Sequence, residues 1–293
     1  MQLFSMFSRI IGLMLVAATL QGCGMVRLAY NQAPDALYWW LDSYFDFNDD
    51  QTLRVRADLD ALQAWHRRSE LPAYAELLRR AQALAPGEVS REQVCELFGT
   101  GRTRALAVLE RLEPTVMAIA PTLDAQQITV LEKHLEKRNR KWRSEWLEGS
   151  AQKRTAHRVN EAVKRAEMFY GGMQERQLAA IRQSISRSSF DAATSYRETV
   201  RRQQDSLATL RAFAAGSGVQ VPEARVREDM RSLFDRLLNS PDAGYRAYIG
   251  TLTLEGCAAI ADLHNSTTPA QRAKAVKTLQ GYEEDFRVLA GSR

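Results

Sequence analysis

Ser150 and Lys153 are the residues of this sequence whose types and spacing come nearest to a catalytic pattern. They fit Ser-x-x-Lys, a spacing in which a serine hydroxyl attacks a carbonyl group and a lysine amine assists it. The Ser-Asp-Asn and Lys-Thr-Gly motifs that complete this chemistry do not occur in the sequence. We therefore expect no catalytic residue at this position.

Metal chemistry has equally little support in the spacing of the ligand-type residues. No two histidines have the His-x-x-x-His spacing of a metal site. The four histidines of the sequence are His66, His134, His157 and His264. An acidic cluster lacks the spacing of a calcium loop and is better explained as charge at a helix start; its members are Asp42, Asp46, Asp49 and Asp50. We expect no bound metal and no cofactor.

Cys23 follows a segment typical of a protein export signal. Residues 1–22 contain one basic side chain, Arg9, no acidic one, and an apolar run from Ile10 to Leu20. That run is too short to span a membrane, which takes about 20 apolar residues. The sequence therefore predicts a signal peptide over residues 1–22, followed by the mature chain, residues 23–293.

The residues at the cut, Leu20-Gln21-Gly22-Cys23, resemble the lipobox of bacterial lipoproteins. The resemblance implies that Cys23 is lipidated on its sulfur and becomes the acylated N-terminus, which anchors the protein to a membrane. Gly24 in place of Asp implies, by the same resemblance, the outer membrane, with the protein facing the periplasm. The alternative is an ordinary signal peptide followed by a chance cysteine.

Cys95 and Cys257 are the two cysteines that remain beyond the anchor. Because the exported compartment is oxidising, we expect them to form a disulfide rather than two buried free thiols. The bridge would close a loop of more than 150 residues and tie the N-terminal half to the C-terminal end. Loop-entropy models assign about 4–5 kcal/mol to so long a loop.

The overall composition is that of a folded globular chain. Hydrophobic residues make up 45% and charged residues 26% of the sequence. The net charge of +5 is modest and gives weak support for an anionic partner. We expect no nucleic-acid partner for an exported protein.

Apolar residues recur at helical spacing through most of the chain. Ile128, Leu131 and Leu135 are one example, and no convincing alternating strand pattern occurs. The sequence predicts an all-α fold, a multi-helix bundle of about nine to eleven helices. We expect helix breaks at proline or glycine, among them Pro72, and one helical domain over 23–293 with a sub-boundary near 216–221 as the best alternative.

Five predicted helix starts share the form cap–x–x–Gln. The cap side chain accepts a hydrogen bond from the first turn and the glutamine bonds back to the cap amide, which is a capping box. Each cap contributes about 1 kcal/mol to helix stability. The five starts are Asn48–Gln51, Ser90–Gln93, Asp124–Gln127, Thr268–Gln271 and a degenerate copy, Gln174–Gln177.

These starts resemble the Leu-Thr-x-x-Gln motif of Spy-like periplasmic chaperones, although no copy matches it in full. The resemblance implies an all-helical, dimeric, cradle-shaped protein that holds unfolding clients on a concave surface. It covers only the helix starts, and a capping box alone explains it.

A wider resemblance covers nearly the whole chain. It is carried by Tyr30–Pro34, Trp39–Asp42 and Phe45–Asn48 behind the anchor, and by Leu263–Gln271 near the far end. These segments look like an uncharacterised family of proteobacterial lipoproteins that is defined only by a domain of unknown function. The resemblance implies a helical, anchored envelope protein and brings no activity with it.

An aromatic stretch, Tyr30 to Phe47, begins seven residues after the expected anchor. Aromatic rings favour the membrane interface, where an apolar body and a polar tip are both satisfied. The alternative is a first helix packed into the core, and both descriptions can hold for different faces.

A basic stretch, Glu132 to Arg165, holds eleven Lys and Arg residues against five Glu, with two tryptophans between them. Such a face suits anionic lipid, lipopolysaccharide phosphates or an acidic client. The alternative is a solvated face with ion pairs between residues three or four apart. The candidate binding residues are Lys137, Arg138, Arg140, Lys141, Trp142, Arg143 and Trp146.

Together these features predict a lipid-anchored, non-enzymatic protein of the bacterial envelope that binds another macromolecule, as a Spy-like chaperone or stress factor. One alternative is a structural scaffold subunit of an envelope complex. A lesser alternative is an enzyme that acts on the cell wall. The expected partners are the membrane and a protein client or envelope protein.

Overall fold

The computed structural model describes residues 24–214 and 222–291, and the regular elements in these ranges are all helices. The predicted all-α multi-helix fold is therefore confirmed. The signal peptide, Cys23 and the possible boundary at 216–221 lie outside the described residues. The elements are α2 (Met25–Asn31), α3 (Ala33–Phe45), α4 (Asp49–Leu84), α5 (Arg91–Ile119), the 3₁₀ turn η1 (Ala120–Thr122), α6 (Ala125–Trp146), α7 (Ala151–Tyr170), α8 (Glu175–Arg187), α9 (Ala192–Phe213), α10 (Glu223–Leu238), α11 (Ala243–Asn265) and α12 (Pro269–Gly291).

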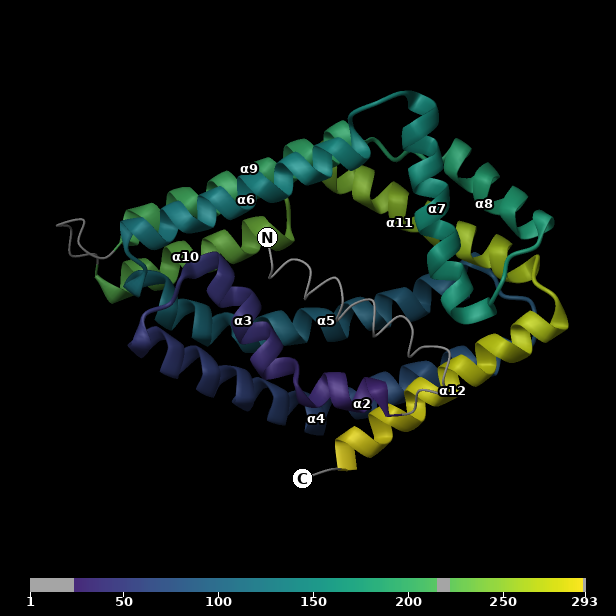
Figure 1. The fold of residues 1–293 in the computed structure, drawn as a ribbon, viewed down its shortest axis with the longest axis horizontal. Coiled ribbons are helices and arrows are strands. Elements are labelled where there is room, and N and C mark those ends of the chain that lie inside the picture. The colour runs from purple at the N-terminus through teal and green to yellow at the C-terminus, as the bar shows by residue number, and fades with distance from the viewer. Residues whose placement is uncertain (1–23, 215–221, 292–293) are drawn as a thin grey trace, which may run out of the picture.

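The helices form an elongated frame (Figure 1). Helices α6 and α9 lie side by side along one long edge, and α4, α5 and α12 pack together along the other. At one end α10 and η1 pack against α9, and at the other end α7, α8 and α11 close the frame. No helix in the described ranges is both long and apolar enough to cross a membrane.

The larger apolar core lies at the η1 end of the frame. Leu123 and Ile128 at the start of α6 are almost fully buried there, together with Met230 of α10. Leu207, Leu210 and Phe213 of α9 complete this core. The helical spacing of apolar residues thus brings three amphipathic helices and one turn around a single core.

The predicted helix break at Pro72 is wrong, because α4 continues through it. Proline removes one backbone hydrogen bond and costs about 3 kcal/mol or more inside a helix. Leu71 and Ala75, on either side of it, are 1% and 2% exposed, since α4 packs against both α5 and α12. Tertiary burial on this segment therefore offsets the local cost.

All five predicted helix starts occur where we expect them. At Asn48, Ser90, Asp124 and Thr268 the cap side chain accepts from the amide three residues later, and the glutamine there accepts from the cap amide. At Gln174 the amide donates to Gln177 Oε1 at 2.6 Å. Each of the five capping glutamines therefore lies in the first turn of its helix and helps to fix the start of that helix.

Four of these glutamines also join helix starts to one another in pairs. The amide nitrogen of Gln51 donates to the carbonyl of Thr122 at 3.0 Å, and that of Gln127 donates to the carbonyl of Asp46 at 2.9 Å. The two side chains also bond each other, with Gln127 Nε2 at 2.7 Å from Gln51 Oε1. Because both glutamines are buried, this pair holds the starts of α4 and α6 together.

The second pair repeats this arrangement at the other end of the frame. Gln177 Nε2 donates to the carbonyl of Ser266 at 3.1 Å, and Gln271 Nε2 donates to the carbonyl of Gly172 at 3.0 Å. The two side chains are again in mutual contact. The starts of α8 and α12 are therefore joined as those of α4 and α6 are, and in both pairs each glutamine donates to the carbonyl five residues before its partner.

Candidate functional site

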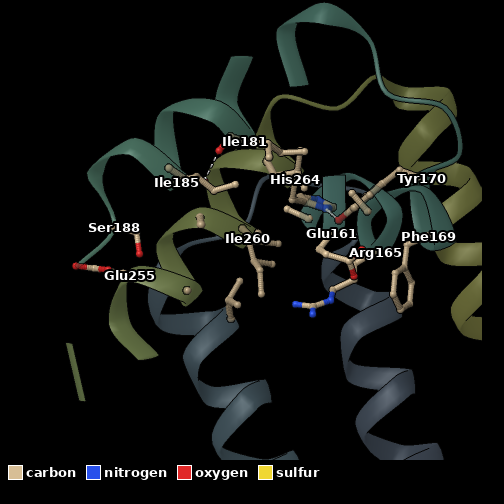
Figure 2. A pocket seen from close by; sticks show the side chains of 18 of the residues that line it. Glu161, Arg165, Phe169, Tyr170, Ile181, Ile185, Ser188, Glu255, Ile260 and His264 are labelled. Atoms are coloured by element: carbon tan, nitrogen blue, oxygen red, sulfur yellow. Dashed lines mark hydrogen bonds between the residues drawn. The ribbon is translucent and has the colours of Figure 1, made fainter. Parts of the chain in front are cut away.

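A large cavity of the described structure lies at the end of the frame where α7, α8 and α11 meet α4, α5 and α12. Its volume is about 740 Å³, within the range of about 300–1,000 Å³ that is usual for small-molecule sites. Figure 2 shows Phe169 of α7, Ile185 of α8 and Ile260 of α11 around it. Most of its lining is aliphatic or aromatic.

A second cavity of about 250 Å³ continues the first along α11. The two cavities share Val94, Leu252, Gly256 and Ile260 in their linings. We call the two together the α11 trough. It is a continuous apolar surface with α11 as its floor.

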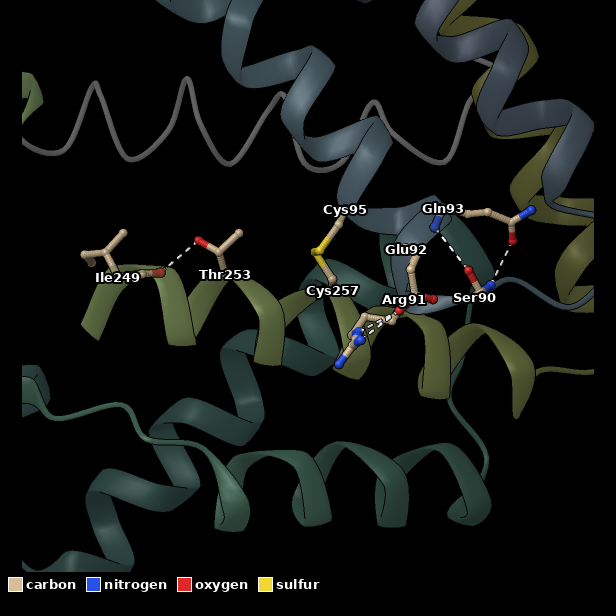
Figure 3. Close-up of a disulfide and its surroundings, with 8 residues drawn as sticks. All are labelled: Ser90, Arg91, Glu92, Gln93, Cys95, Ile249, Thr253 and Cys257. Atoms are coloured by element: carbon tan, nitrogen blue, oxygen red, sulfur yellow. Dashed lines mark hydrogen bonds and ion pairs between the residues drawn. A yellow bond between two sulfur atoms is a disulfide. The ribbon is translucent and has the colours of Figure 1, made fainter. Parts of the chain in front are cut away.

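The disulfide fixes that floor in place (Figure 3). Cys95 of α5 and Cys257 of α11 are bonded, with their Cα atoms 5.4 Å apart. The predicted pairing is thus confirmed. Because Cys257 directly follows Gly256, the bridge holds α11 against α5 at the point where the two cavities meet.

One end of the trough is closed by a buried hydrogen-bond network around His264. Its Nε2 donates to the carbonyl of Gly87 at 2.9 Å, so its Nδ1 accepts from the Tyr170 hydroxyl, also at 2.9 Å. The adjacent Asn265 bonds both the amide and the carbonyl of Val89. Burial lowers the pKa of His264 and raises the pKa of Tyr170, which favours the neutral form of both.

Two arginines of α7, Arg158 and Arg165, line the cavity on another side. Arg158 lies with its guanidinium 4.9 Å from the centre of the Phe190 ring, and burial lowers its pKa. In Figure 2, Arg165 extends from α7 towards the open centre of the cavity. In the part of the chain that the structure describes, neither guanidinium has a hydrogen bond or ion pair.

The carboxylates beside these arginines have hydrogen-bond partners of their own, although Glu161 also interacts electrostatically with Arg165 and Glu255 with Arg158. Glu161 lies 2.9 Å from the ammonium group of Lys164, and this hydrogen bond lowers the pKa of Glu161. Glu255 accepts from the amide and the hydroxyl of Ser189, and these hydrogen bonds lower the pKa of Glu255. Among the lining residues of α7 the two guanidiniums outnumber the one carboxylate, Glu161, while Glu255 of α11 brings a second negative charge to the same cavity.

The predicted binding face on α6 is divided by the fold. Trp142 stacks on Trp146 and on Tyr196, and Arg143 donates to the Tyr196 hydroxyl at 3.2 Å. The other four basic residues of this face are exposed: Lys137, Arg138, Arg140 and Lys141. Arg140 pairs with Glu136, Lys141 pairs with Glu145, and Arg138 lies over the ring of Tyr44. Trp146 is the predicted residue that also lines the cavity.

The aromatic stretch behind the expected anchor is divided in the same way. Tyr38 is 5% exposed, and its hydroxyl lies 3.0 Å from that of Thr52 in α4. Trp39 and Trp40 are 62% and 52% exposed on the same helix, α3. One side of α3 therefore packs on the core while two large rings face outwards.

The other chemical candidates have structural roles or no site. The Ser150 hydroxyl accepts from the amide of Lys153, which makes the Ser-x-x-Lys spacing a helix cap of α7. Across 24–214 and 222–291, no group of three His, Cys, Asp or Glu side chains is placed to hold a metal. Asp42 accepts from the amide of Phe47 at the end of α3.

Sequence reasoning alone missed the residues that define the trough. Arg158 and Arg165 lie inside the basic stretch, but nothing in their spacing separates them from its solvated residues. His264 stands in a segment that supported the family resemblance, and its role as a closing residue depends on contacts with α7 and with the α4–α5 loop. Gly256 lies in the middle of a helix, where glycine costs about 1 kcal/mol, but Gly250 in the same helix lines neither cavity, so glycine alone does not mark the trough.

Comparison with known protein families gives one match. The model of DUF6279, a family of unknown function, matches residues 43–231. The chain belongs to DUF6279. The DUF6279 match includes α4 to α9, which supply one side of the trough, and it ends before α11 and α12. No curated protein and no solved structure matches the chain.

Proposed function

We propose that this protein is a lipid-anchored, non-enzymatic binding protein of the bacterial envelope, which engages a partner by holding an apolar part of it in the α11 trough. The observation that carries the proposal is the trough itself, an apolar cavity of about 740 Å³ that continues into a second one. Apolar surface gains free energy when it leaves water, so an apolar segment of a partner would bind there.

The contacts of the polar lining favour binding over catalysis. A general base needs a free nitrogen within reach of its substrate, whereas both ring nitrogens of His264 are bonded within the chain. The Ser184 hydroxyl donates to the carbonyl of Ile181, and Glu255 accepts from Ser189. Each of these groups would have to break a structural contact before it could act on a substrate.

The anchor is part of the proposal and rests on the lipobox resemblance at Cys23. We propose the outer membrane, with the helical body in the periplasm. The exposed Trp39 and Trp40 of α3 support a position near a membrane interface, because indole rings are favoured there. A partner in this location is an exported protein client, as for a Spy-like chaperone, or a subunit of an envelope complex for which this protein is a scaffold.

Crosslinking in cells followed by affinity purification and mass spectrometry tests the proposal. We expect Ile260→Asp, which charges the trough, to lose the crosslinked partner. Leu53→Asp on α4 is the control, because Leu53 is 71% exposed and lines neither cavity. Equal recovery from both variants would show that the trough does not bind the partner. One partner at near-equal amounts indicates a scaffold, and a broad set of exported proteins indicates a chaperone.

A further inference from the structure

We propose that the apolar segment held in the α11 trough is an acyl chain attached to an anionic head group, with the head group at Arg158 and Arg165. This inference rests on the proposed function and names the ligand of the same site. Four features carry it: the shape of the trough, the state of its polar groups, the two arginines and the position of Gly256.

The shape of the trough suits a long, narrow ligand. Its two cavities adjoin along α11, where they share four lining residues. From Glu255 to His264 the helix axis advances about 14 Å at 1.5 Å per residue. His264 and Tyr170 close one end, and Arg158 lies near Glu255 at the other.

The polar groups of the trough favour an acyl chain over a peptide. Every residue of a peptide brings a backbone N–H and C=O, and a buried one without a partner is strongly unfavourable. The hydrogen-bonding groups of Tyr170, His264 and Ser184 are already used within the protein. Along this part of the lining an extended peptide would therefore find few partners for its backbone groups, whereas an acyl chain needs none.

The two arginines favour an anionic head group. Arg158 is half-buried and lies against the Phe190 ring, and in the described chain it has neither an ion pair nor a hydrogen bond. Arg165 follows two helical turns later on α7 and is also without such a partner there. Both nearby carboxylates, Glu161 and Glu255, are bonded to other side chains. Arg165 is exposed and Arg158 is half-buried, so a phosphate or carboxylate at the cavity could accept hydrogen bonds from both guanidiniums.

Gly256 keeps the trough open at a place where helix stability favours another residue. Glycine in a helix interior is less favourable than alanine, and a Cβ at position 256 would meet nothing within 4 Å. Packing within the chain therefore does not require the glycine. The space that a side chain would fill is the junction of the two cavities.

The experiment places the photoreactive residue p-benzoylphenylalanine at position 260 of the full-length protein in living cells. Position 254 is the matched control, because Ile260 and Leu254 are both 53% exposed on α11 but only Ile260 lines the trough. After irradiation, mass spectrometry identifies the adduct. We expect an acyl lipid at position 260 with at least ten times the yield at 254, and its mass distinguishes a phospholipid from a free fatty acid.

Four other outcomes overturn the inference. A protein adduct at position 260 refutes the acyl ligand and leaves the proposed function standing. Equal lipid adducts at 260 and 254 show general membrane contact, and an adduct with the acyl chains on Cys23 shows that the trough holds the protein's own anchor. No adduct at position 260 refutes both the acyl ligand and the proposed function.

A second measurement uses the helix glycines. We expect Gly256→Leu to reduce the lipid adduct at position 260 at least tenfold. Gly250→Leu is the control, since its Cβ also meets nothing within 4 Å and Gly250 lines neither cavity. The double variant Arg158→Gln and Arg165→Gln should reduce the lipid adduct, whereas the double variant Arg158→Lys and Arg165→Lys keeps the positive charges and should retain it. Unchanged adduct in Gly256→Leu, with the disulfide formed and the helical content retained, would overturn the inference.

Discussion

Gln127→Glu provides a sharp test of the glutamine pairs, because it replaces the side-chain NH₂ group with an oxygen atom and keeps the side-chain shape. Gln127 is 5% exposed, and its amide nitrogen donates to the carbonyl of Asp46 and to Gln51 Oε1. A carboxylate cannot donate either bond. It can still accept from the amide of Asp124, so the capping box itself survives.

The expected cost follows from these contacts. Two lost hydrogen bonds contribute about 0.5–1.5 kcal/mol each, and a buried acceptor left without a donor adds about 1–3 kcal/mol. The new carboxylate would also be buried beside two oxygen atoms, the Asp46 carbonyl and Gln51 Oε1. We therefore expect the free energy of unfolding to fall by about 3–5 kcal/mol at neutral pH.

Gln93→Glu is the matched control. Gln93 occupies the same position in the capping box of α5 and accepts from the amide of Ser90 at 2.8 Å, but it is only partly buried and joins no second helix start. Glutamate is a normal residue at this position of a capping box, so we expect a change within about 0.5 kcal/mol.

Equilibrium urea unfolding, followed by far-UV circular dichroism, measures both variants. Neutral surface changes alter the free energy of unfolding by up to about 0.5 kcal/mol. A difference between the two variants smaller than this amount would refute the argument. Lowering the pH provides a second check. A protonated carboxyl can donate one hydrogen bond, and burial beside oxygen atoms raises the pKa of this carboxyl above its usual value of about 4.3. The difference in unfolding free energy between the variants should therefore narrow as pH falls from neutral towards about 4.3.

Three further predictions follow from the disulfide and from two shifted pKa values. Replacing Cys95 and Cys257 by serine should lower the free energy of unfolding by about 2–5 kcal/mol in urea titrations, and an unchanged midpoint would contradict the role of the bridge. Burial lowers the pKa of His264, so the unfolded chain binds the proton more tightly than the folded chain. Stability should therefore fall as pH drops below about 6.5. In thermal melts, His264→Gln should make the melting temperature less dependent on pH in this range. The hydrogen bond from Arg201 is the main cause that holds the pKa of Glu198 at about 2. The stability that ionised Glu198 contributes should therefore be present above about pH 4.3 and be lost as pH falls towards about 2. In thermal melts, Glu198→Gln should remove this loss of stability at acidic pH.

Short-range signals in the sequence predicted the helices and their starts. A capping box needs only four consecutive residues, and each of the five boxes begins a helix of the structure. The Cys95–Cys257 bridge was also predictable, because export leaves two cysteines in an oxidising compartment. These features depend on composition or on neighbours within one turn.

Features that depend on distant contacts could not be predicted from the sequence. Pro72 has a strong local tendency to end a helix, and only the packing of α4 against α5 and α12 explains why it does not. The basic stretch contained Arg158 together with many solvated lysines and arginines, and its position on the cavity wall is set by α8 and α11. The trough is lined by residues of seven helices together, so no single segment indicates it.

The glutamine pairs have a consequence for reading other sequences of this kind. Glutamate serves as well as glutamine at the third position of a capping box, so the spare amide hydrogens of glutamine are of use only if another segment accepts them. In this protein four glutamines donate those hydrogens to a backbone carbonyl beside the start of a distant helix: Gln51, Gln127, Gln177 and Gln271. Glutamine at a buried helix start therefore carries long-range information in a local motif, and two such motifs mark which helix ends meet.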